Sequence, residues 1–413
     1  MGLKHTIRGY ARLPKSIIAI FFARIINSLG NFVYPFLTIY LTEKMGMTSD
    51  RVGNFMLMAA IFMGLGSIVG GKLSDVIGRK KIILIFQAMS AITLIPCGFY
   101  EYSMITPWLL ILSGFFGGAV QPASAALIGD LTNTKNRQEA FSLLYLGINI
   151  GIAVGPLIAG VLYKNYIRWI FWGDAITTLS SLILIIVFVK ESINDIKEEE
   201  IEKDNIDEKS EEGNLFMVMM KRPALLIFSL VCLIYSFVYA QNGFLIPLQV
   251  KEAYPENGAV LYGSLMSINA IVVVFFTFII IHLTRKNYAI FNMVLSGIFY
   301  TVGFGMLFYV KSYEFFIIST VIWTIGEIIA STNQGVYIAN HTPMSHRGRV
   351  NSIIPLIAGT GYAIGPKIMG LYIKNRALSR AWLVIAVCSV LAAVMMYILY
   401  KVEIHNKKSH KNL

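Results

Sequence analysis

The sequence predicts an all-α membrane protein with twelve transmembrane helices in two pseudo-symmetric six-helix halves. Of the 413 residues, 56% are hydrophobic and only 14% are charged, which is too apolar for a water-soluble globule. Apolar runs of about 20 residues, the length that crosses ~30 Å of hydrocarbon, recur along the chain. Lipid offers no partner for the open backbone of a strand. We place the helices near residues 15–41, 52–71, 82–100, 106–129, 140–163, 169–189, 223–249, 261–283, 288–310, 313–338, 350–373 and 381–400.

The basic residues predict the orientation of these helices. Most of the 35 Lys and Arg residues lie in the N-terminal segment, in the even-numbered loops and in the C-terminal tail. Because cytoplasmic loops carry the excess of Lys and Arg, both termini are expected to face the cytoplasm. The net charge of +12 then reflects this bias and needs no nucleic acid to explain it.

One long polar stretch, residues 190–222, separates the sixth and seventh helices. It is dense in Glu, Asp and Lys and poor in aromatic residues, which is typical of a solvated linker. The expected organisation is an N-terminal six-helix half at 1–189, a cytoplasmic acidic linker at 190–222, and a C-terminal half with a basic tail at 223–413.

The two halves repeat each other at one constant offset. "GIAVGPLIAG" at 151–160 faces "GYAIGPKIMG" at 361–370, with six of the ten positions identical. The same offset sets Arg137 against Arg347. A duplicated unit of membrane helices is typical of a transporter whose site lies between its halves.

The fifth helix carries a stripe of small residues on one face. Gly147, Gly151 and Gly155 are spaced by four, and Pro156 and Gly160 follow. Small residues let another helix approach closely, and Pro156 can bend the helix. Close helix packing alone is the simpler interpretation. The Gly-Pro step recurs at the equivalent position of the second half, which favours a functional role for this stripe.

Charge is concentrated in "GGKLSDVIGRKKI", the loop between the second and third helices. Gly71 and Gly78 permit a tight turn and close helix contact. Asp75 is expected near the N-terminus of the third helix, where the helix dipole favours a carboxylate. Arg79 is placed to pair with Asp130 at the end of the fourth helix. Such a cluster can act as a conformational switch, whereas topological anchoring alone would not require the aspartate and the glycines.

These motifs carry a resemblance to a known family. "GKLSDVIGRKK" resembles the helix two–three loop motif of the major facilitator superfamily. "GIAVGPLIAG" resembles the helix-five antiporter motif of that superfamily's proton-coupled exporters, with Ala159 in place of the second-to-last glycine. The resemblance implies alternating access driven by proton exchange. One departure is Gly114, which stands where such exporters often carry an arginine in the fourth helix.

Three charges inside predicted helices are candidates for proton coupling, because charge is costly in a membrane and usually functional. They are Arg24, Glu327 and Lys367. An apolar setting disfavours a carboxylate, so Glu327 is the main candidate for a group that loads and releases a proton. The alternative is a structural carboxylate permanently paired with Arg24 or Lys367.

Polar and aromatic residues on the first, fifth, seventh, eighth and tenth helices are candidate substrate contacts, because the resemblance implies that these helices line a central cavity. Aromatic rings there can stack on a flat or cationic ligand. The polar candidates are Asn27, Asn31, Asn149, Gln241, Asn242, Asn269 and Gln334, and the aromatic ones are Tyr34, Tyr145, Tyr235, Tyr239 and Trp323.

The expected function is secondary active transport, with export of amphiphilic drugs or related small molecules in exchange for protons. A lipid or lysolipid flippase on the same fold and a proton-coupled nutrient importer are the alternatives. No motif for a nucleophile and base, a metal or a phosphate loop is recognisable, so neither an enzyme nor a cofactor is expected. The expected partners are a small amphiphilic substrate, protons and membrane lipid, with a monomer in a bacterial plasma membrane.

Overall fold

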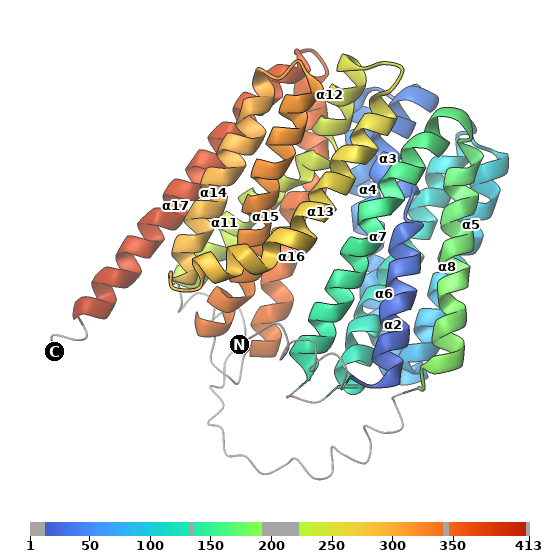
Figure 1. The fold of residues 1–413 in the computed structure, drawn as a ribbon, viewed down its shortest axis with the longest axis horizontal. Coiled ribbons are helices and arrows are strands. Elements are labelled where there is room, and N and C mark those ends of the chain that lie inside the picture. The colour runs from blue at the N-terminus through green and yellow to red at the C-terminus, as the bar shows by residue number, and fades with distance from the viewer. Residues whose placement is uncertain (1–12, 133–135, 192–222, 342–346, 410–413) are drawn as a thin grey trace, which may run out of the picture. The chain divides into compact units, whose positions relative to one another are not determined.

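The computed structural model describes residues 13–132, 136–191, 223–341 and 347–409 (Figure 1). Across these residues the structure is helical, without strands, which confirms the all-α class. The chain divides into two compact units. The first unit comprises Met1–Met47, Phe55–Ile206 and Val250–Ile271, and the second comprises Thr48–Asn54, Asp207–Gln249 and Val272–Leu413. The predicted linker lies outside the described residues except for Lys190 and Glu191, so its boundaries stay a prediction.

The first six predicted spans form seven α-helices, because the first span is broken. A π-helical turn, η1, follows the break. The elements are α2 (Lys15–Leu29), α3 (Val33–Ile39), η1 (Tyr40–Lys44), α4 (Ser49–Ile77), α5 (Arg79–Phe99), α6 (Ile105–Asp130), α7 (Arg137–Asn165) and α8 (Arg168–Phe188).

The last six predicted spans show a matching break in their first member. Short 3₁₀ turns interrupt or precede several helices. The elements are α11 (Pro223–Tyr239), η3 (Ala240–Asn242), α12 (Leu245–Ala253), α13 (Gly258–Thr284), α14 (Ala289–Gly305), η4 (Met306–Phe308), α15 (Tyr313–His341), α16 (Arg347–Ile373), η6 (Leu378–Arg380) and α17 (Ala381–Ser409).

Length and composition support the predicted number of spans. Eleven stretches of the described chain are long and apolar enough to cross a membrane, with Lys15–Lys44 and Pro223–Ala253 each counted as one span. The remaining helix, α16, has 27 residues and is therefore about 40 Å long at 1.5 Å per residue. Together they make the twelve predicted helices.

The helix packing repeats between the two sets of six. In the first set, α2 packs against α7 and α8, while α5 packs against α6 and α8. In the second set, α11 packs against α16 and α17, while α14 packs against α15 and α17. Each contact has its counterpart at the equivalent position, so the duplication seen in the sequence is also a duplication of tertiary structure.

Both sets open with a helix that is interrupted. The first break follows Gly30, and the carboxylate of Asp174 on α8 accepts a hydrogen bond from the backbone N–H of Val33 at 3.4 Å, where α3 begins. The second break is the turn η3, which contains Gln241 and Asn242. Interrupted membrane helices are typical of transporters, because their freed backbone groups can line a binding site.

Candidate functional site

Glu327 lies among aromatic side chains from four helices of the second unit. Its carboxylate accepts a hydrogen bond from the hydroxyl of Tyr239 on α11 and interacts electrostatically with Tyr300 on α14. The ring of Tyr239 lies 6.0 Å from Trp323 on α15 and 6.5 Å from Tyr362 on α16. We call these five residues the Glu327 cluster.

The chemistry of the Glu327 cluster suits a proton or an organic cation. A carboxylate within a membrane helix is expensive unless a partner neutralises it. Aromatic faces attract cations through their quadrupole, so the rings that surround Glu327 add to the attraction of its charge. A proton and a cationic ligand would therefore compete for the same carboxylate.

Two buried polar atoms, one in the Glu327 cluster and one two residues after Tyr239 in the chain, have no hydrogen-bond partner among the described residues. They are Oε1 of Gln241 and Nε1 of Trp323, and both side chains are fully buried. The amide nitrogen of Gln241 donates back to Phe237 O at 2.9 Å, which leaves its oxygen free. The amide oxygen of Gln241 can accept a further hydrogen bond, and the indole nitrogen of Trp323 can donate one.

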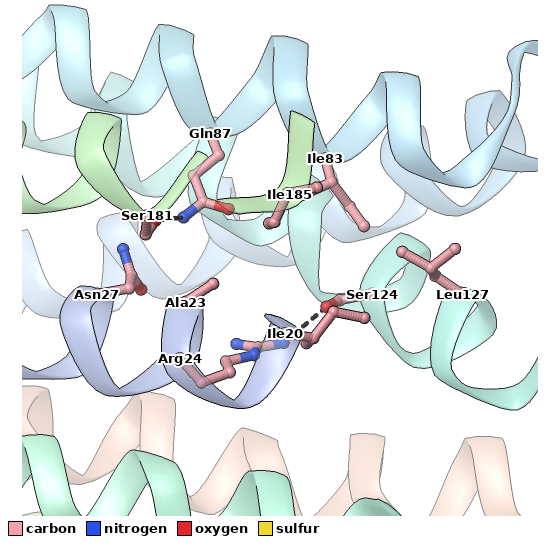
Figure 2. A pocket seen from close by; sticks show the side chains of 10 residues that line it. All are labelled: Ile20, Ala23, Arg24, Asn27, Ile83, Gln87, Ser124, Leu127, Ser181 and Ile185. Atoms are coloured by element: carbon pink, nitrogen blue, oxygen red, sulfur yellow. Dashed lines mark hydrogen bonds between the residues drawn. The ribbon is translucent and has the colours of Figure 1, made fainter. Parts of the chain in front are cut away.

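The first unit contains a small cavity beside Arg24 that is lined by polar and apolar residues in equal number. It has a volume of about 20 Å³, which is enough for one water molecule. Figure 2 shows the guanidinium of Arg24 directed toward Ser124 on α6, with Nη2 donating to Oγ at 2.7 Å. Above it, the amide of Gln87 on α5 donates to Ser181 on α8 at 3.3 Å (Figure 2).

Arg24 has no carboxylate within 4.0 Å in the described part of the first unit. One turn further along α2, Asn27 donates to Thr178 at 3.0 Å, and Thr178 in turn contacts Asp174 at 3.5 Å. The cavity thus places a positive charge beside neutral hydrogen-bonding groups.

The third candidate for proton coupling, Lys367, is half-buried on α16. Considering only described residues, it forms no ion pair, so the alternative in which Glu327 is neutralised by Lys367 has no support in the second unit. Its role in coupling stays a prediction.

The remaining candidate contacts occupy varied positions. Asn149 is buried but donates within its own helix to Tyr145 O at 2.9 Å, whereas Tyr145 itself is exposed. Asn31 is exposed at the break in the first span, and Asn242 and Gln334 are half-buried. Among the described candidates, Tyr239 and Trp323 belong to the Glu327 cluster, and the ring of Tyr235 lies 5.9 Å from that of Tyr300 in the same cluster.

The cytoplasmic loop motif forms the predicted ion pair. Arg79 Nε lies 3.2 Å from Asp130 Oδ2, and both side chains are largely buried, at 13% and 18% exposure. Arg79 also contacts Asp75 at 3.3 Å, but that carboxylate is 70% exposed. Solvent screens an exposed pair, so the contact with Asp130 is the stronger one.

The predicted position of Asp75 is wrong. Asp75 lies in the last turn of α4, and Glu191 occupies the N-terminus of α5 instead. Its two carboxylate oxygens accept from the backbone N–H groups of Lys80 and Lys81, both at 3.2 Å. Gly78 adopts a φ of +118°, and a β-carbon there would overlap the Glu191 carboxylate. This contact has no local sequence signal, because four helices separate Glu191 from the loop.

We expect Asp130→Asn to lower the free energy of unfolding by about 1–3 kcal/mol and to slow transport, because it leaves the buried Arg79 charge without its main partner. Asp75→Asn is the matched control and should change stability by less than about 0.5 kcal/mol. Thermal melting of both purified variants measures the difference. Equal losses of stability in the two variants would show that the exposed contact matters as much as the buried one. A normal transport rate in both variants would show that the loop motif only anchors the helices in the membrane.

The glycine stripe of α7 is a site of close helix contact. A β-carbon on Gly151 would lie 2.6 Å from Leu29 N, and one on Gly155 would lie 2.5 Å from Leu29 O. The equivalent stripe on α16 contacts α11 and the turn η3: a β-carbon on Gly361 would overlap Leu233 O on α11, and one on Gly365 would lie 2.9 Å from Gln241 Nε2 in η3. The repeated motif therefore sets the approach of equivalent helix pairs, and in the second unit it also positions Gln241.

The sequence matches the family description Major Facilitator Superfamily over residues 20–366 and 293–413. The MFS-type transporter YqjV of Bacillus subtilis is 24% identical, over 86% of this chain and 85% of its own. A Na⁺, Li⁺, K⁺/H⁺ antiporter of Planococcus maritimus is 22% identical over 81% of this chain and 84% of its own.

Solved structures share the fold at low sequence identity. A POT family transporter in complex with a thioalcohol-conjugated peptide has a TM-score of 0.77 and 14% identity, covering 96% of this chain and 99% of its own. The nucleoside transporter NupG has a TM-score of 0.74 and 16% identity, covering 94% and 99%. These structures are similar in architecture and carry no information about substrate.

Proposed function

This chain belongs to the major facilitator superfamily of membrane transporters, and we propose that it exports amphiphilic drugs or related small molecules in exchange for protons. The Glu327 cluster carries the proposal. Its carboxylate accepts a hydrogen bond from Tyr239 within a ring of aromatic side chains. Such a site binds an amphiphilic cation through charge and through stacking.

Exchange follows from competition at that carboxylate. When Glu327 is protonated it is neutral and loses its attraction for a cation, so proton binding favours substrate release. When substrate binds, the proton is displaced. A ligand and a proton are exchanged only if each lowers the other's affinity, and a shared carboxylate meets this requirement.

Among the relatives, the Planococcus maritimus protein is named an antiporter, and the multidrug resistance protein MdtH of Photorhabdus laumondii is 31% identical over 37% of this chain. Both names support an exchanger or exporter. The helix-five motif, which resembles that of proton-coupled exporters, supports the same direction.

Transport in inside-out membrane vesicles tests the proposal. With an acidic lumen, an amphiphilic cation such as tetraphenylphosphonium should accumulate, and its entry should release protons in proportion. Vesicles without the protein are the control. Accumulation that is unaffected when the pH gradient is collapsed, with no proton movement, would contradict proton antiport.

A second candidate function, movement of a lipid or lysolipid, is favoured by Arg24. Its charge has no carboxylate partner in the described first unit, whereas the phosphate of a zwitterionic head group would supply an anionic one. In the same vesicles, labelled lysophosphatidylcholine should then change leaflets without proton release. Lysolipid movement that is lost in Arg24→Gln, with no exchange of tetraphenylphosphonium for protons by the wild-type protein, would select the second function.

A further inference from the structure

We propose that an anionic phospholipid binds on the membrane-facing side of α14 and α17, independently of what the chain transports. These two helices pack side by side in the second unit (Figure 1). Between them lies a groove with a volume of about 310 Å³, which is within the range of sites that hold small molecules. Both helices are candidate membrane spans, so the groove opens within the depth of the bilayer.

The lining of the groove is apolar and follows one face of each helix. The lining positions recur at helical spacing, so the hollow runs along the helices as an extended slot. Thr301 also lies there, but its hydroxyl donates to Gly297 O at 2.8 Å, which leaves its methyl group for the groove. The other principal residues are Val294, Ile298 and Val302 on α14 and Val390, Val394 and Tyr397 on α17. An acyl chain matches this shape and chemistry.

Positive charge lies at the end of the groove marked by Tyr397. Lys401 is one turn beyond Tyr397 on the same helix face, with its ammonium 5.4 Å from the centre of that ring. At this end the ring of Tyr400 lies 6.1 Å from Tyr288, and Arg285 and Lys286, both exposed, lie three and two residues before Tyr288 in the chain. The loop and the helix end thus bring basic side chains to the rim.

The order of these groups along the membrane normal matches a phospholipid. Tyrosine rings are enriched at the depth of the head groups, so Tyr288, Tyr397 and Tyr400 mark the interface. Lys and Arg just outside that level attract anionic head groups. A neutral zwitterionic lipid would fill the apolar groove equally well, so the basic rim is what selects an anionic phosphate head.

Thermal melting of the full-length protein in dodecyl maltoside, with added micelles of phosphatidylglycerol or phosphatidylcholine, tests this site. Phosphatidylglycerol should raise the melting temperature at a lower lipid concentration than phosphatidylcholine does. Lys401→Glu should increase the phosphatidylglycerol concentration required by about tenfold. The matched control is Lys311→Glu, which reverses an exposed lysine in the loop before α15 and should leave the response unchanged.

A second pair of variants tests the groove itself. Val394→Trp fills the groove, while Leu391→Trp places the same side chain on a similarly exposed position of α17 outside the groove. Native mass spectrometry should show one bound phosphatidylglycerol fewer for Val394→Trp only. Equal stabilisation of the wild-type protein by both lipids would overturn the proposal. So would a loss of lipid response in Lys311→Glu or Leu391→Trp as large as in Lys401→Glu or Val394→Trp. Conversion of a dimer to a monomer by Val394→Trp with lipid binding intact would assign this face to a second copy of the chain instead.

Discussion

Glu327→Gln should abolish proton-driven accumulation of substrate while the protein still folds and melts close to the wild-type temperature. The amide resembles the protonated carboxyl group in shape and can accept the hydrogen bond from Tyr239. It cannot take up or release a proton, so the coupling between proton and substrate that depends on this position vanishes. Exchange of an uncharged substrate down its own gradient can continue, whereas binding of a cationic substrate should weaken because the amide carries no negative charge.

The measurement is uptake into inside-out vesicles with and without a pH gradient, together with thermal melting of the same purified variant. Glu314→Gln is the matched control, because Glu314 lies in the exposed first turn of the same helix. A structural ion pair at Glu327 predicts a different result, namely a melting temperature well below wild type because a buried charge loses its partner. Full gradient-driven uptake with normal melting would contradict both roles.

Gly155→Leu should prevent the close approach of α7 and α2 and stop transport. Even a single methyl group at Gly155 would lie 2.5 Å from the backbone oxygen of Leu29, and backbone cannot move aside cheaply. Gly155→Ala should therefore lower the free energy of unfolding by about 1–3 kcal/mol. At Gly365 the nearest atom belongs to the Gln241 side chain, so Gly365→Ala should cost less than Gly155→Ala.

Gly359→Ala is the control for helix propensity. It lies on α16 with nothing within 4 Å of the added carbon, so the substitution should stabilise the protein by up to about 1 kcal/mol. The expected effects at Gly155 and Gly359 thus have opposite signs. Thermal melting of the alanine series checks them, and stabilisation by Gly155→Ala would show that the helices are not in tight contact there.

Several features of the molecule were predictable because they depend on local pattern. Runs of apolar residues predicted the twelve helices, and spacing by four placed Gly151 and Gly155 on one helix face. The constant offset between the halves predicted that equivalent helices pack alike. The pairing of Arg79 with Asp130 was also accessible, since both residues end membrane helices on the same side.

The sequence by itself determined which segments cross the membrane and that the second half of the chain repeats the first. It also determined that Arg24, Glu327 and Lys367 are charges within helices. Only the tertiary structure decided what surrounds them. Tyr300 and Tyr362 lie in the cluster that contains Glu327. Glu191, and not Asp75, accepts the backbone hydrogen bonds at the N-terminus of α5. The physical reason is that hydropathy and helical spacing are set by near neighbours in the chain. Side chains from four helices meet only if each helix is rotated and packed correctly. Contacts between residues that are distant in the sequence determine that packing.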